Sequence, residues 1–179
     1  MSGRRAIAVF CSFCFLTGTG HTQQTVPTPG TRTFAAIRDG VAQADATGAQ
    51  EIRLRWVSRD PRTASQPATE AVQVLERRRL AGRVGRERHP ELSLDKLVVV
   101  ATDLSGKDVD WRIVADPRLL RGETADSRGV LSGQSFRRIE ADLLVTIPDR
   151  PEIRRLLLYE PRWTGREFVL DLLGAVELP

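Results

Sequence analysis

Trp163 is the residue of this sequence best suited to contact another molecule. It lies in the segment Arg162-Trp163-Thr164-Gly165-Arg166, whose glycine and threonine are typical of a hairpin turn. An indole beside arginines at such a tip can cover a sugar ring or fill a pocket of a partner protein. Alternatively, the indole folds back over the end of a sheet and belongs to the core. The candidate binding residues are therefore Trp163, Arg162 and Arg166.

Acidic residues at spacing i, i+2 are the next candidates for chemistry. On a strand, Asp108 and Asp110 would point to one face, where two carboxylates can bind a cation. Asp103 could join them at a hairpin tip and complete a set of oxygen ligands for calcium. An ordinary solvent-facing surface explains the same pattern, because Arg112 continues it. The calcium site is therefore an alternative to a simple charged surface.

Catalytic groups are scarce. His89 is the one histidine outside the N-terminal region, and one imidazole cannot build a histidine-cluster zinc site. The chain has no G-x-S-x-G elbow and no glycine-rich phosphate loop with the required spacing. We therefore expect no catalytic residue, no metal and no cofactor. A hydrolase that uses carboxylates or His89 is the alternative.

Arginines crowd the segment from Glu76 to Pro90. They are Arg77, Arg78, Arg79, Arg83, Arg86 and Arg88. Such a run can engage phosphate, sulfate or lipid headgroups. No aromatic residue is interleaved for stacking on bases, so no nucleic acid partner is expected. The glycines and charges of this segment predict an exposed, mobile loop.

The first 20 residues have the pattern of a secretory signal peptide. Arg4 and Arg5 precede an uncharged, mostly apolar run over 6–17, and small residues follow at 18–20. We expect cleavage near Gly20 and a secreted or periplasmic protein. An uncleaved membrane anchor and a lipoprotein are the alternatives.

Loss of this segment would change the inventory of the chain. Cys11 and Cys14 both lie in the apolar run, so the mature chain would have no disulfide and no thiolate chemistry. It would carry 25 basic and 23 acidic residues, a net charge of +2 that gives little steering toward polyanions. The chain has no asparagine and strongly prefers arginine to lysine, a bias typical of GC-rich bacterial coding.

The elements that must position these residues begin after a polar linker at 21–30. Residues 31–50 read as a flexible segment or as a helix capped by Thr33. From Glu51 the apolar residues alternate with polar ones, as they do in half-buried strands. Segment 67–80 fits either a helix or a strand, and 118–134 reads as a long connection. Expected strands are 51–57, 97–101, 109–113, 139–147, 153–159, 168–172 and 175–178.

About seven short strands separated by turns predict an all-β fold for 51–179. The preferred architecture is an antiparallel β-sandwich, similar to immunoglobulin-like domains in layout but without their paired cysteines. A barrel is the second choice. The function expected from this architecture is a non-catalytic binding, adhesion or assembly module of the bacterial envelope. Its partner would be a protein or glycan of that envelope, with no stable membrane span after cleavage.

Overall fold

The computed structural model describes residues 31–43, 45–57, 71–125, 127–129 and 131–178. The expected signal peptide and the linker at 21–30 lie outside these residues. The described elements are β1 (Arg32–Thr33), α1 (Phe34–Gly40), β2 (Ala46–Val57), β3 (Ala71–Val84), β4 (Lys96–Thr102), β5 (Asp108–Ala115), β6 (Leu119–Ala125), β7 (Leu131–Arg137), β8 (Glu140–Pro148), β9 (Arg155–Trp163) and β10 (Phe168–Glu177).

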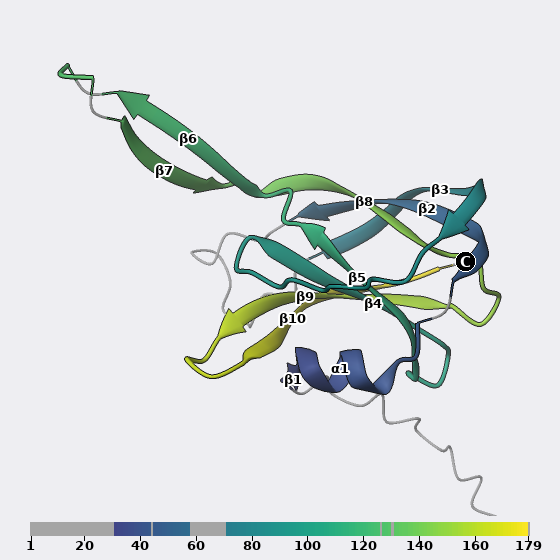
Figure 1. The fold of residues 1–179 in the computed structure, drawn as a ribbon. Coiled ribbons are helices and arrows are strands. Elements are labelled where there is room, and N and C mark those ends of the chain that lie inside the picture. The colour runs from purple at the N-terminus through teal and green to yellow at the C-terminus, as the bar shows by residue number, and fades with distance from the viewer. Residues whose placement is uncertain (1–30, 44, 58–70, 126, 130, 179) are drawn as a thin grey trace, which may run out of the picture.

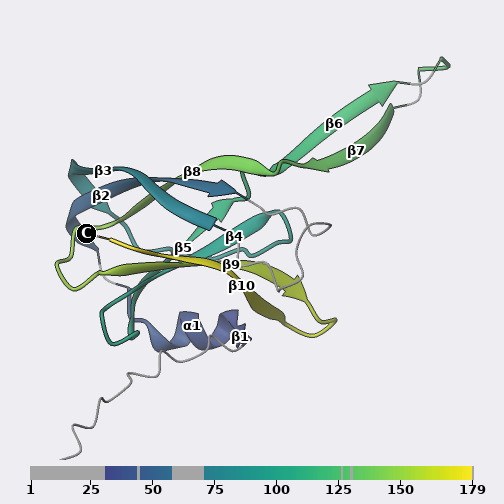
Figure 2. The same cartoon turned by 180° about the vertical axis from the view of Figure 1, so that it is seen from behind.

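The strands form two stacked sheets and a projecting hairpin. One sheet has the order β1-β10-β9-β4-β5 and the other the order β3-β2-β8, and every pairing is antiparallel. Figures 1 and 2 show the three-stranded sheet on one face of the five-stranded sheet and α1 on the other. Strands β6 and β7 pair only with each other and extend away from both sheets as an arm (Figure 1). The expectation of an all-β, antiparallel fold is confirmed.

The main core lies between the two sheets and follows the predicted alternation. Ile52, Leu54 and Trp56 of β2 are fully buried there. Strand β8 contributes Leu143 and Val145 from the adjacent position of the same sheet. Side chains of β4 and β9 close the core from the opposite sheet. Alternate residues of these four strands therefore point into one apolar layer.

A second core lies beneath α1. Phe34 and Ile37 are buried against the other face of the five-stranded sheet, and the Phe34 ring meets Trp111 edge-on at 5.3 Å. Thr33 caps the helix, because its Oγ1 accepts a hydrogen bond from the N–H of Ala36 at 3.2 Å. The described fold thus reaches back to β1, before the change of composition at Glu51.

Strand β4 is buried on both faces, as its continuous apolar sequence predicts. Leu97, Val99 and Ala101 face the core between the sheets. Val98 and Val100 face the core beneath α1. The strand lies between β9 and β5, so its backbone is also paired on both edges.

The arginine-rich segment is a correction to the predicted mobile loop. Residues up to Val84 belong to β3, an exposed edge strand that pairs with β2 along its length. Charged residues of β3 form ion pairs with β2. For example, Arg78 Nε donates to Glu51 Oε1 at 2.6 Å. Because most side chains of this end are exposed on both faces, the sequence carries no clear strand periodicity. The described part of 67–80 is likewise strand rather than helix.

The connection predicted over 118–134 and the turn predicted at 161–165 also need correction. Most of the first is the β6–β7 arm, whose exposed faces give no alternation. The second begins too early, because β9 continues through Pro161 to Trp163. Pro161 is tolerated since pairing with β4 ends at Tyr159, which leaves one edge of β9 open. Ile139 precedes β8 and is 73% exposed, so only the later residues of that alternation point inward.

Candidate functional site

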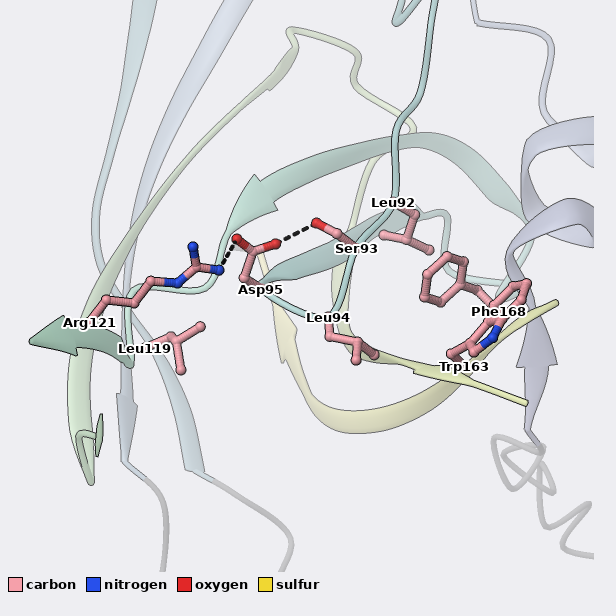
Figure 3. Close-up of a pocket in the computed structure, with 8 residues that line it drawn as sticks. All are labelled: Leu92, Ser93, Leu94, Asp95, Leu119, Arg121, Trp163 and Phe168. Carbon is pink, nitrogen blue, oxygen red and sulfur yellow. Dashed lines mark hydrogen bonds and ion pairs between the residues drawn. The ribbon is translucent and has the colours of Figure 1, made fainter. Parts of the chain in front are cut away.

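A groove of about 720 Å³ opens where the β9–β10 hairpin, the loop before β4 and the base of the arm meet (Figure 3). Its lining residues are Leu92, Ser93, Leu94, Asp95, Leu119, Arg121, Trp163 and Phe168. Most of these side chains are apolar, and Leu94 and Trp163 are largely exposed. The groove therefore presents apolar surface to solvent at the base of the arm.

The register of the β9–β10 hairpin builds the aromatic wall of the groove. Trp163 and Phe168 are cross-strand partners, and their ring centroids lie 4.9 Å apart. Gly165 closes the turn with a φ of 91°, a conformation that L-residues rarely adopt. The Thr164 N–H donates to the Glu167 carbonyl at 3.0 Å and fixes the turn. Trp163 stays 49% exposed, so its indole has one free face.

The opposite end of the groove is polar but already hydrogen-bonded. Asp95 accepts a hydrogen bond from the Ser93 hydroxyl and forms an ion pair of 2.9 Å with Arg121 (Figure 3). The Ser93 hydrogen bond, assisted by Arg121, holds the pKa of Asp95 below its usual value. The Asp95 carbonyl also accepts from the Asp116 N–H at 2.9 Å. This loop is therefore tied both to the arm and to the chain that leads into it.

A buried ion pair fixes the start of the arm. Arg118 donates from Nε and Nη2 to the two Asp116 oxygens at 3.0 and 2.9 Å, and both side chains are almost fully buried. Its guanidinium carbon lies 3.6 Å from the centre of the Trp56 ring. Leu119 follows directly, so its place in the groove is set by the anchored Arg118.

Only one of the three predicted binding residues lines the groove. Trp163 does so, whereas Arg162 is paired with Asp171, with Nε and Oδ2 2.8 Å apart. Asp171 lies opposite Glu160, two positions along the β9–β10 ladder from Arg162. This hydrogen bond raises the pKa of Arg162 above its usual value. Arg166 is exposed within the turn and is not a lining residue.

Sequence reasoning missed the leucines of the groove. Leu92 and Leu94 alternate just before a buried strand, and this was the available signal for them. Leu119 begins a segment with exposed faces, so nothing in its neighbourhood distinguished it. Pairing of Asp95 with Arg121 depends on tertiary contacts that local sequence does not report.

The three carboxylates of the calcium alternative are held apart. The β4–β5 ladder has a bulge at Val109, so Asp110 lies opposite Ala101 and Asp108 opposite Thr102. Because Ala101 and Thr102 are consecutive, Asp108 and Asp110 face opposite sides of the sheet. Asp108 pairs with Arg32 of β1, and Asp110 with Arg112 at 2.9 Å.

The Asp103 side chain stabilises the turn between β4 and β5. Its Oδ1 accepts from the backbone N–H of Ser105 at 2.8 Å and of Lys107 at 2.9 Å. These hydrogen bonds, with that of the Ser105 hydroxyl the largest, lower the pKa of Asp103. Within the described ranges, no group of three histidine, cysteine or acidic residues is placed to hold a metal ion.

His89 lies apart from the groove. It borders a depression of about 190 Å³ together with Glu87, Glu91 and Lys96. Its imidazole is exposed and forms no hydrogen bond with any residue that the structure describes. The geometry around His89 therefore contains no oriented base–nucleophile pair.

Comparison with known proteins gives no relative from which to transfer a function. No protein-family description, curated protein or solved structure matches the chain. Among the described helices and strands, no helix is long and apolar enough to cross a membrane.

Proposed function

We propose that this protein is an exported, non-catalytic binding module that receives apolar side chains of an envelope protein in the Trp163 groove. The observation that carries the proposal is an exposed aromatic wall, formed by Trp163 and Phe168, facing exposed leucine in one groove. Residues 1–20 would act as the signal peptide and deliver the protein to the periplasm or the exterior.

The two stacked antiparallel sheets support an immunoglobulin-like sandwich as the framework of this module. They share one core, and the loops and hairpins gather at its two ends. In such frameworks, binding surfaces are commonly built from the loops at one end. The groove has this location, since Trp163 ends β9 and Leu119 begins β6.

A protein partner fits the groove better than a glycan. Sugar sites combine an aromatic face with polar groups that are free to bond hydroxyls. Here the carboxylate of Asp95 is engaged by Ser93 and Arg121, and the remaining lining is apolar. An apolar side chain that displaces water from this lining gains affinity without leaving polar groups unpaired.

The test compares Trp163→Ala with His89→Ala, a matched truncation of another exposed side chain. A partner is captured from the native envelope with the wild type and is then titrated against both variants. Trp163→Ala is expected to weaken binding by about 2 kcal/mol or more, the loss typical of a central aromatic contact. His89→Ala should leave the affinity within about twofold of the wild type.

Fluorescence quenching gives a second readout on the wild type. Trp56 and Trp111 are buried, so Trp163 dominates quenching by a soluble quencher such as acrylamide. Binding in the groove should protect this indole. Unchanged quenching at saturation, a larger loss from His89→Ala, or turnover in a hydrolase screen would contradict the proposal.

A further inference from the structure

A second cavity, of about 660 Å³, lies at the opposite end of β9 from the groove. It is lined by Gln50, Arg77, Arg79, Asp149, Pro151 and Arg154. Three guanidinium groups thus meet a single carboxylate. The lining carries a formal net charge of +2, in contrast to the apolar groove.

A bulge in β3 decides which arginines line this cavity. Leu75 has no partner in the β2–β3 ladder, and beyond it Arg77 lies opposite Ile52 and Arg79 opposite Gln50. Ile52 faces the core between the sheets, and Gln50 continues the same face of β2. Cross-strand partners share a face, so both arginines lie where the apolar core ends. Without the bulge, their neighbours in β3 would take these positions.

A buried amide and one carboxylate hold these two arginines. Gln50 is only 2% exposed; its Oε1 accepts from Arg77 Nε at 2.8 Å and its amide donates to Asp149. Asp149 Oδ2 lies 3.1 Å from Arg79 Nε. The Arg79 contact is made by Nε, and the rest of this side chain reaches solvent, since it is 82% exposed. The terminal nitrogens of Arg79 form no hydrogen bond with any described residue, so their donors are available to an entering anion.

The third arginine of the cavity, Arg154, has a hydrogen-bonded backbone. The Arg154 N–H donates to the Thr102 carbonyl at 2.8 Å, and its carbonyl accepts from the Leu178 N–H at 2.7 Å. Its guanidinium has no hydrogen bond or ion pair with the residues that the structure describes. An exposed positive charge is therefore presented to the cavity from an anchored position.

We propose that this cavity binds the phosphate group of a phosphomonoester. Guanidinium groups match phosphate oxygens with paired N–H donors, and a formal charge of +2 complements a dianion. The volume exceeds that of one phosphate group and leaves room for the moiety that carries it. This site is separate from the groove and does not depend on the function proposed for it.

Two phosphate sources separate a soluble ligand from a lipid headgroup. The full chain is titrated with inorganic phosphate and glycerol 3-phosphate, followed by amide NMR shifts, and is cosedimented with vesicles of phosphatidylcholine with or without phosphatidic acid. Saturable shifts of the Gln50 and Arg154 amides assign a soluble ligand. Binding only to the phosphatidic acid vesicles assigns a headgroup. Binding to none of these probes overturns the proposal.

Two arginine substitutions in the cavity and one outside it locate the site. Arg154→Gln and Arg79→Gln should each weaken phosphate binding about tenfold, the usual effect of one lost charge-assisted contact. Arg83→Gln removes the same charge from β3 outside the lining and should change affinity less than about twofold. Equal losses in all three would show general charge attraction and overturn the site.

Asp149→Asn gives a result of opposite sign. The asparagine can still accept from Gln50, but it no longer opposes the anion. Phosphate should therefore bind more tightly than to the wild type, and a melting temperature close to that of the wild type would confirm that the fold is intact. Weaker binding by a folded Asp149→Asn variant would contradict the proposed charge balance.

Discussion

Asp110 shows how burial and pairing compete at a single residue. Its side chain is buried in β5, with Oδ2 2.9 Å from Arg112 Nη2. Arg112 also donates from Nη1 to the Gly85 carbonyl at 2.8 Å. Burial raises the pKa of Asp110 above its usual value, because desolvation outweighs the favourable charge of Arg112.

The raised pKa predicts that acidification stabilises the wild type relative to Asp110→Asn. The folded state holds the proton at a higher pH than the unfolded chain, so this contribution is present below the ordinary pKa of 3.8 and is lost as the pH rises through the folded pKa. The difference in unfolding free energy, wild type minus variant, should therefore increase between about pH 7 and about pH 4. Urea unfolding of both proteins across this range measures it.

Asp142→Asn is the control for that slope. Hydrogen bonds from Arg55 and then Arg53 hold the pKa of Asp142 below its usual value. Its stabilising contribution is present above the ordinary value of 3.8 and is lost only as the pH falls further. A difference for Asp110→Asn that decreased on acidification would show that Arg112 dominates and keeps the carboxylate charged.

Among the elements, the strands that could be predicted from the sequence are those with a buried face. Strands β2, β4 and β8 each pack at least one face on a core, so their apolar residues alternate or run together and could be predicted. Strand β3 and the arm expose both faces over much of their length, and cross-strand pairing rather than burial defines them. No clear periodicity therefore marks them: the sequence predicts a helix or a strand for 67–80, a loop for the arginine-rich part of β3 and a connection for the arm.

The same distinction applies to the candidate site. Trp163 could be predicted as a contact residue because it stands next to turn residues that are typically exposed, within the five-residue segment 162–166. The rest of the groove joins segments distant in sequence, from Leu92 to Phe168. The bulges at Leu75 and Val109 could not be predicted either, yet they decide which charged residues share a face.

Strand β8 offers a direct test of the predicted alternation. Leu143 is buried between the sheets, whereas its neighbour Leu144 is 55% exposed. Leu143→Ala should lower the unfolding free energy by about 2–4 kcal/mol, because the truncated side chain leaves a cavity. Leu144→Ala should cost less than about 0.5 kcal/mol, since it empties no packed site. Urea denaturation of both variants provides the comparison, and similar losses would contradict the assigned faces.

At the scale of the whole molecule, the two candidate sites use opposite ends of one scaffold. Arg154 precedes β9 at the arginine cavity, and Trp163 ends the same strand at the groove. The two cores on either side of the five-stranded sheet hold β9 between them. An apolar and a cationic surface are thereby kept apart on a packed framework, so each can be altered without the other.

The outer part of the arm is predicted to be dispensable for the stability of the two sheets. None of its described residues belongs to either core, and a two-stranded hairpin alone adds little stability. Deletion of 123–133 would join Gly122 to Gln134 as a two-residue loop between Arg121 and Ser135, which are already cross-strand partners.

The shortened protein should unfold in one transition with a melting temperature within about 4 °C of the wild type, since about 1 kcal/mol corresponds to a few degrees at this size. Calorimetry measures this. A much larger decrease would show that the arm stabilises the sheets.

The deletion spares Leu119 and Arg121, so the Trp163 groove keeps its full lining. If partner binding is confined to the groove, its affinity should survive the deletion, whereas its loss would place part of the interface on the arm.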